Sequence, residues 1–204
     1  MRVVVLLGAG PIFCAGADVA ELDIADPSDL HRFIALGNAA FQDLRDLPQP
    51  VIAGIQGQAV GGGLELALAC DLRIASVGTQ FGLPEITLAG VPGWGGTRRL
   101  QEVIGAGTAR HMAITGTPID VDQALQIGLI SSIEPVDRLR DACLAMADSL
   151  AEKDPTALRY VKAALTAASP YESAAHRLLD ELSNVACMYT DGRRDAIARF
   201  QGRR

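Results

Sequence analysis

The run of three glycines in AVGGGLELALACD, residues 59–71, constrains the fold of this chain most. Glycine allows a ligand or another backbone to approach closely. The apolar run 64–69 that follows is typical of a buried helix, and a helix start directs N–H groups toward an anion. Glu65 lies in the first turn of that helix. Carboxylates are rarely buried unless they are paired or used, so Glu65 is a candidate catalytic group. The ordinary alternative is a solvated or helix-capping carboxylate.

The segments around the glycine run predict an α/β arrangement. Short β-branched or apolar runs indicate strands, and the glycine turn and its helix separate two of them. The predicted strands are 2–7, 51–56 and 71–76. A helix is predicted over 29–47, with Ser28 as its cap and prolines after its end. The succession of strand, glycine turn, helix and strand is typical of the βαβ unit of an α/β protein. Residues 79–96 are expected to form an ordered loop.

The second half of the chain is predicted to be mostly helical. Apolar residues repeat with the helical period in several segments, and a short strand signal interrupts them near 129–133. The predicted helices are 97–104, 108–115, 121–128, 136–153, 155–168, 170–188 and a last turn over 195–200. We therefore divide the chain into an α/β core, residues 1–136, and a helical C-terminal region, residues 137–204.

Composition excludes several classes of function. The 204 residues carry a net charge of −6 and no basic run of five, so nucleic acid is not an expected partner. The four cysteines and three histidines are scattered, which predicts neither a metal site nor a disulfide framework, and reduced thiols favour a cytoplasmic location. No segment approaches the roughly 18 apolar residues that a membrane span needs.

Glu85 is a second isolated carboxylate in an apolar setting. It lies in QFGLPEITLAGVPGWGGTRRL, residues 80–100, and is the only carboxylate between Asp71 and Glu102. Burial raises the pKa of a carboxyl group, and a second carboxylate nearby raises one of the two further. Glu65 and Glu85 therefore form a candidate acid/base pair that holds one proton near neutral pH.

A third small-residue turn lies in FCAGADV, residues 13–19. It is predicted to lead into a short helix with Asp18 near its start. Standing alone, this pattern is best explained as a tight turn with Asp18 as the helix cap.

Together, these motifs resemble the enoyl-CoA hydratase/isomerase (crotonase) family. The resemblance is carried by FCAGADVAEL, PVIAGIQGQAVGGGLELALACDLRIAS and FGLPEITLAGVPGWGGTRRL, in that order and separation, and it covers nearly the whole chain. It implies a crotonase-like ββα superhelix, incomplete at the N-terminus, followed by a helical C-terminal oligomerisation region.

The resemblance assigns roles to individual positions. It implies that the backbone N–H groups of Ala17 and Gly62 form an oxyanion hole. Glu65 and Glu85 match the two catalytic acids of the hydratases. Gly93 matches the glycine whose amide helps to hold the catalytic water.

The resemblance also implies what the protein binds. We expect Trp94, Phe81 and Asp18 to contact substrate, with Leu83 in the pocket wall, although Trp94 could equally pack in the core. The implied reaction adds water across a trans-2-enoyl-CoA thioester to give 3-hydroxyacyl-CoA, as in fatty-acid β-oxidation. Coenzyme A is expected only as part of the acyl-CoA substrate, with no metal or redox cofactor and no membrane partner. A homotrimer or hexamer is the expected assembly.

Two alternatives remain open. Another reaction of the family is possible, such as double-bond isomerisation, thioester hydrolysis or decarboxylation; the presence of both Glu65 and Glu85 favours hydration. The chain also lacks the strand, turn and helix that family members carry upstream of 2–7. It is then either an enzyme whose start is assigned too far downstream or a non-catalytic remnant. A Rossmann dinucleotide binder is excluded, because GAGPIFCAGAD has no GxGxxG in register.

Overall fold

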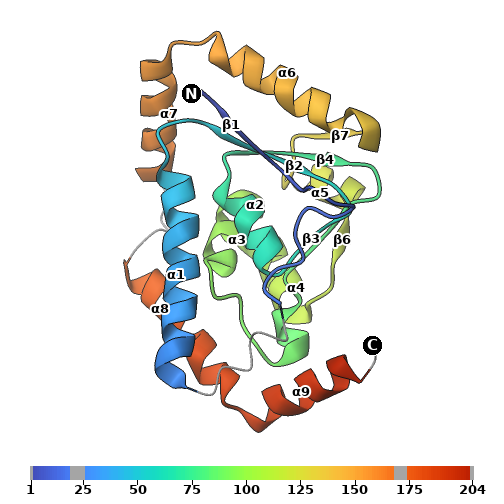
Figure 1. The fold of residues 1–204 in the computed structure, drawn as a ribbon, viewed down its shortest axis with the longest axis vertical. Coiled ribbons are helices and arrows are strands. Elements are labelled where there is room, and N and C mark those ends of the chain that lie inside the picture. The colour runs from blue at the N-terminus through green and yellow to red at the C-terminus, as the bar shows by residue number, and fades with distance from the viewer. Residues whose placement is uncertain (1, 19–25, 168–173, 203–204) are drawn as a thin grey trace.

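The computed structural model describes residues 2–18, 26–167 and 174–202. Its centre is a parallel sheet with the strand order β1-β2-β4-β7 (Figure 1). The strands are β1 (Val4–Leu7), β2 (Val51–Ile55), β4 (Leu72–Ser76) and β7 (Ser132–Glu134). All three pairings in this sheet are parallel, so helices must cross between successive strands. The predicted α/β class is confirmed.

A smaller sheet lies beside the first and joins β3 (Gln58–Val60), β5 (Gln80–Gly82) and β6 (Ile119–Asp120). The sequence analysis did not find β3 or β6 and assigned β5 to a loop. The backbone bridge between Cys14 and Ala59 extends this pairing toward the N-terminal segment. The small sheet therefore brings residues 14–18 alongside the start of the glycine-run helix.

Helices surround both sheets. In chain order they are α1 (Pro27–Asp46), α2 (Gly62–Ala69), α3 (Gly96–Ile104), α4 (Ala106–Thr115), α5 (Val121–Gln126), α6 (Leu139–Ala151), α7 (Pro155–Ala167), α8 (Ala174–Met188) and α9 (Asp191–Gln201). The 3₁₀ helices are η2 (Pro84–Leu88) and η3 (Val136–Arg138). The predicted helical second half is confirmed in these residues. The short helix predicted after Asp18 lies outside the described residues, as does 168–173 of the C-terminal region.

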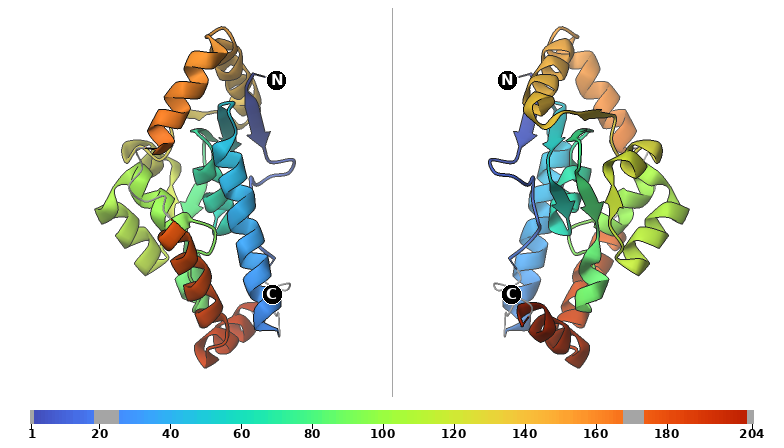
Figure 2. Two further views of the ribbon diagram at one scale, coloured as in Figure 1. Left: turned by 90° about the vertical axis from the view of Figure 1, so that its left-hand side faces the viewer. Right: turned by 90° about the vertical axis from the view of Figure 1, so that its right-hand side faces the viewer.

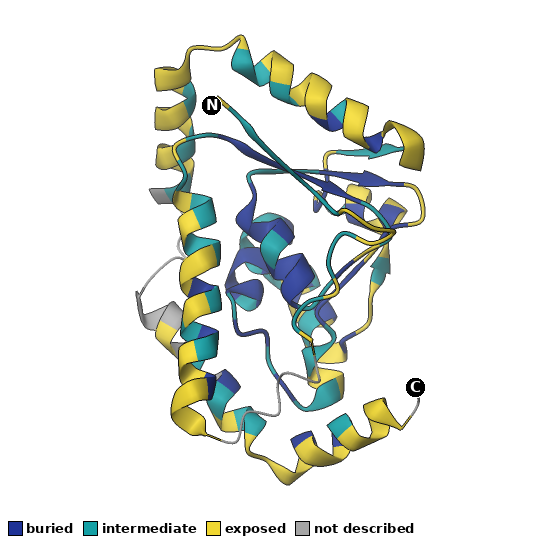
Figure 3. Ribbon diagram, viewed as in Figure 1, coloured by how far each residue is buried: buried dark blue, intermediate teal, exposed yellow. Residues whose placement is uncertain are grey.

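Alternate residues of β2 face opposite sides of the sheet, because side chains alternate along a strand. Ile55 joins the main core with Leu64 of α2, whereas Ile52 joins Leu139 and Cys143 of α6. All of β2 is therefore buried, and α2 is buried almost all round (Figure 3). Helix α6 packs on the sheet even though it begins the helical region predicted from residue 137. That domain boundary stays a prediction.

Helix α1 begins two residues earlier than predicted. Asp26, and not Ser28, is its N-cap, and the Asp26 side chain accepts a hydrogen bond of 2.7 Å from the Ser28 N–H. Pro27 occupies the first helical position, where a missing N–H costs nothing. The helix ends at Asp46, just before Pro48, as the sequence indicates.

Helices α8 and α9 belong to the C-terminal part of the chain but pack against elements from its first half. Helix α8 packs along α1 (Figures 1 and 2). Helix α9 packs on η2. This packing places C-terminal residues beside α1 and near Glu85 of η2. Among the described helices, none combines the length and apolarity needed to cross a bilayer.

A partly buried ion pair fastens α7 to the start of β2. Lys162 Nζ lies 2.7 Å from Asp71 Oδ2 and also donates to the Gln49 carbonyl at 3.0 Å. The same Asp71 oxygen accepts from the Val51 N–H at 2.7 Å. The Lys162 side chain is only 9% exposed, so water screens the pair weakly.

We expect Lys162→Met to lower the free energy of unfolding by about 1–3 kcal/mol, because Asp71 loses a charged partner in a poorly hydrated site. Urea denaturation should show a lower midpoint at constant slope. The matched control is Arg138→Met, which breaks an exposed pair with Asp141 and should change stability by less than about 0.5 kcal/mol. Equal effects of the two substitutions would contradict the prediction.

Candidate active site

The start of α2 is crowded on every side. Gly61 adopts φ +57°, which is unfavourable for most other residues. A Cβ on Gly63 would lie 2.0 Å from the Cys14 carbonyl oxygen, and one on Gly62 would lie 2.5 Å from Cζ3 of Trp94. The glycine run is therefore needed for close approach. As the first residue of α2, Gly62 has an N–H group with no acceptor inside the helix.

Residues 15–17 lie against this helix start. A Cβ on Gly16 would be 3.0 Å from the Gly62 nitrogen. Ala17 and Gly62 line a single cavity of about 120 Å³. The structure thus brings together the two segments whose N–H groups the resemblance assigned to an oxyanion hole.

Glu65 lies one turn into α2 and faces the same cavity. Its side chain is buried, at 2% exposed. Its Oε1 accepts two hydrogen bonds of 2.8 Å, from the backbone N–H groups of Trp94 and Gly96. Hydrogen bonds donated to a carboxylate favour its ionised form. The apolar helix α2 therefore carries one acid that is held by the 92–96 loop and lines the cavity.

Two side chains fasten the carbonyl groups of that loop. Asn38 of α1 donates to the Gly93 carbonyl at 2.8 Å, and Arg99 of α3 donates to the Trp94 carbonyl at 2.9 Å. The loop therefore has its carbonyls bound on one side and its N–H groups directed at Glu65 on the other. Such fixed donors keep the carboxylate in one position.

Trp94 both lines the cavity and packs in the interior, and its contact with substrate stays a prediction. Its ring lies 5.5 Å from the ring centroids of Phe33 and Phe41 of α1. A Cβ on Gly37 would overlap its indole nitrogen. The ring thus joins α1 to the start of α2.

Glu85 reaches the cavity from η2. Its Oε2 is buried and has no hydrogen-bond partner among the described residues. The pKa of this carboxyl group is raised to about 8, first by burial and then by the charge of the neighbouring Glu65. The charge of Arg193 offsets part of this rise. Near neutral pH Glu85 is therefore mostly protonated. The two acids of the predicted pair line one cavity, and together they can hold one proton.

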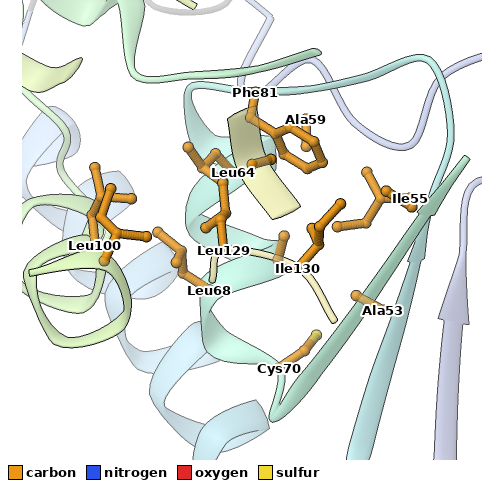
Figure 4. Packing of buried hydrophobic residues seen from close by; sticks show 14 of the residues in the cluster. Ala53, Ile55, Ala59, Leu64, Leu68, Cys70, Phe81, Leu100, Leu129 and Ile130 are labelled. Carbon is orange, nitrogen blue, oxygen red and sulfur yellow. The ribbon is translucent and has the colours of Figure 1, made fainter. Parts of the chain in front are cut away.

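Not every predicted residue reaches the cavity. Phe81 is fully buried in the main core beside Ala59 and Leu64, and Leu83 belongs to the same cluster (Figure 4). The interpretation of Phe81 and Leu83 as pocket residues is corrected, because Phe81 of β5 and Leu83, which follows this strand, both pack into the core. Asp18 is exposed and does not line the cavity.

The sequence analysis missed the residues that close the cavity from α1, α8 and α9. Phe33, Ile34, Asn184, Met188 and Arg193 line it together with the predicted residues. Polar residues in amphipathic segments are ordinarily assigned to the solvent face, and the sequence held no signal against that assignment.

Asn184 of α8 is 7% exposed, and its Nδ2 donates to the Val91 carbonyl at 2.7 Å. Its Oδ1 is buried without a partner among the described residues. A Cβ on Gly93 would lie 2.6 Å from the Asn184 Nδ2. Asn184 therefore lies beside the 92–96 loop.

Within the described residues, no cluster of three His, Cys, Asp or Glu side chains could hold a metal ion. The groups that line the cavity offer proton transfer by two carboxyl groups and charge stabilisation by backbone N–H groups.

Comparisons with known proteins show which proteins this chain is similar to. The sequence profile of the family described as Enoyl-CoA hydratase/isomerase matches residues 1–204. A short-chain-enoyl-CoA hydratase of Clostridium acetobutylicum is 35% identical over 198 residues, which cover 97% of this chain and 76% of that protein. A probable mitochondrial enoyl-CoA hydratase 2 of Arabidopsis thaliana is 35% identical over 204 residues, covering 100% of this chain and 68% of the relative.

Solved structures of enoyl-CoA hydratases are similar to this chain in fold. The crystal structure of an enoyl-CoA hydratase from Bacillus anthracis matches with a TM-score of 0.79 at 36% identity, covering 100% of this chain and 80% of that one. An enoyl-CoA hydratase from Mycobacterium avium subsp. paratuberculosis matches with a TM-score of 0.88 at 25% identity, covering 97% and 79%.

Proposed function

The chain belongs to the enoyl-CoA hydratase/isomerase family, and we propose that it adds water across the double bond of a trans-2-enoyl-CoA thioester to give a 3-hydroxyacyl-CoA. The predicted family and crotonase fold are confirmed. Relatives named as enoyl-CoA hydratases, about 35% identical along nearly the whole chain, support hydration. Isomerisation of the double bond is the alternative reaction.

The observation that carries this proposal is that two carboxyl groups in different surroundings line one cavity. Glu65, held by two backbone N–H groups, is suited to accept a proton from water. The water oxygen then forms a bond to C3 of the enoyl chain. Glu85, protonated near neutral pH, is suited to deliver its proton to C2. Dehydration uses the same groups in reverse, so the pair carries one proton before and after each turnover.

The negative charge that develops on the thioester oxygen needs donors. We assign this role to the N–H groups of Ala17 and Gly62, which line the cavity with both acids. The dipole of α2 adds to the effect at its N-terminus. Only backbone atoms serve here, so the site depends on the shape of residues 15–17 and 61–63.

Gly93 is proposed to hold the reacting water, as the resemblance implies. Gly93 lines the cavity, lies next to Asn184 and directly precedes Trp94, whose N–H group donates to Glu65. This position supports the proposal. The unpartnered Oδ1 of Asn184 supplies an acceptor that such a water can use.

The pKa of Glu85 sets the pH dependence. We expect kcat/KM to fall about tenfold per pH unit above about pH 8, because the pair then loses its single proton. Hydration releases no proton, so the same limb should appear in the dehydration direction. Initial rates with crotonyl-CoA and 3-hydroxybutyryl-CoA between neutral and strongly alkaline pH check this. A flat profile through this range would contradict the assignment of Glu85 as the acid.

The direct test of the function is hydration of crotonyl-CoA by the purified chain, followed as loss of the enoyl-thioester absorbance. Activity that Glu65→Gln abolishes supports hydration. A folded chain that leaves crotonyl-CoA unchanged but converts a 3-enoyl-CoA into a 2-enoyl-CoA is an isomerase. A chain without a cooperative melt and without activity would favour the non-catalytic alternative.

The remaining expectations belong to the same proposal. Coenzyme A enters only as part of the substrate, no metal or redox cofactor takes part, and the reaction serves fatty-acid β-oxidation in the cytoplasm. A homotrimer or hexamer is proposed. Large apolar side chains exposed on α7 and α8 support subunit contacts. They are Tyr160, Val161, Leu165, Leu178 and Leu182.

A further inference from the structure

A cationic side chain lines the cavity, and the proposed reaction does not use it. Arg193 of α9 lines it beside Glu85 and Leu88 of η2. The Arg193 side chain is buried, with only 6% of the residue exposed. Its Nη1 donates to the Leu88 carbonyl at 2.7 Å. A guanidinium group carries further N–H donors that this one bond does not engage.

No described carboxylate forms an ion pair with Arg193. The acid beside it on the cavity wall is Glu85, whose pKa of about 8 leaves it mostly uncharged near neutral pH. Burying a charge without an opposite charge is costly. An acyl tail made only of CH₂ and CH₃ groups binds best against apolar side chains, and a buried cation adds nothing to its affinity.

We propose that Arg193 is a specificity-determining residue that binds a carboxylate at the far end of the acyl chain. The preferred substrates are then 2-enoyl-CoA thioesters of dicarboxylic acids. A carboxylate supplies the opposite charge that the buried guanidinium lacks, and the planar group suits two parallel hydrogen bonds. This inference rests on the proposed hydration, since it concerns the acyl end of the same site.

A purely structural role is the competing explanation. Through the Leu88 carbonyl, Arg193 joins α9 to the helix that carries Glu85. In that case its loss would impair turnover of every enoyl-CoA alike. The two explanations differ in the ratio of activities toward two substrates.

The test compares crotonyl-CoA with glutaconyl-CoA, which carries a carboxylate on the last carbon of the crotonyl chain. The wild-type chain should show the higher kcat/KM for glutaconyl-CoA. Arg193→Gln should lower the ratio of glutaconyl-CoA to crotonyl-CoA kcat/KM by about 10- to 100-fold, mainly through KM. Arg193→Lys should restore part of the ratio. The matched control Arg194→Gln, at an exposed position on the same helix, should keep the wild-type ratio.

An equal loss with both substrates, or a wild-type preference for crotonyl-CoA, would overturn the proposal. A binding measurement covers the cases of an unstable variant or an inactive chain. The wild-type chain should bind glutaryl-CoA at least about tenfold more tightly than butyryl-CoA by calorimetry. Equal or weaker binding of glutaryl-CoA would refute the role of Arg193. Tighter binding without any hydration would refute the proposed reaction and leave the carboxylate site standing.

Discussion

Replacing Glu65 with Gln is expected to lower kcat for crotonyl-CoA hydration by more than about 10²-fold. Gln cannot accept a proton from water, although its Oε1 can still accept the N–H groups of Trp94 and Gly96. The loop and the cavity should therefore keep their shape. Steady-state kinetics give the rate, and thermal unfolding followed by circular dichroism should show a nearly unchanged midpoint.

Two further variants complete this prediction. Glu85→Gln should cause a loss of similar size, and the double variant should lose little more than either single one, because the two acids act as one unit. Glu152→Gln removes an exposed carboxylate at the end of α6 and serves as the matched control, with wild-type rates. A near-normal rate in Glu65→Gln would remove this residue from the mechanism.

The parts of the fold with local signals were predictable from the sequence. The apolar run after the glycines predicted α2, and short β-branched runs predicted β1, β2 and β4. These elements are wholly or partly buried, so their composition records their environment. Strands β3 and β6 have two or three residues each and exist through pairing with distant segments, which leaves no local pattern to detect.

The candidate site was predictable where function limits the residue type. An isolated acid in an apolar helix and a second one in an apolar loop indicated Glu65 and Glu85. The donors to Glu65 could not be predicted. They are the backbone N–H groups of Trp94 and Gly96, a group that nearly every residue carries, and their direction depends on the loop path. Phe81 was misassigned because a motif does not say which face of a strand each residue occupies.

The C-terminal wall of the site illustrates a different limit. Asn184 lies in a segment that was predicted as a helix, whereas Arg193 lies in α9 just before the last turn predicted over 195–200. Periodicity separates polar from apolar faces, and it cannot tell that α8 and α9 turn two polar residues toward a cavity. Only tertiary packing of α8 on α1 and of α9 on η2 decides this. The residues that we connect with substrate choice are thus those that the sequence pattern concealed.

Gly62→Ala is expected to damage activity and stability together. Its Cβ would lie 2.5 Å from Cζ3 of Trp94, so the ring must move. The Trp94 backbone N–H holds Glu65, and the Gly62 N–H is the proposed oxyanion donor. We expect kcat/KM to fall by about 10²–10³-fold. Overpacking should lower the free energy of unfolding by about 1–3 kcal/mol, measured by urea denaturation.

The clash with the ring can be separated from other effects of the Gly62 methyl group. Gly107→Ala adds the same group in α4, where the new Cβ meets nothing within 4 Å, and should leave activity unchanged and stability equal or up to about 1 kcal/mol higher. Trp94→Leu alone should destabilise the chain, because the ring packs against Phe33 and Phe41. Combined with Gly62→Ala, it should cost less than the sum of the two single changes, since the clashing ring is gone. Strict additivity would show that the Gly62 methyl group is accommodated without moving Trp94, and that the glycine is needed for some other reason.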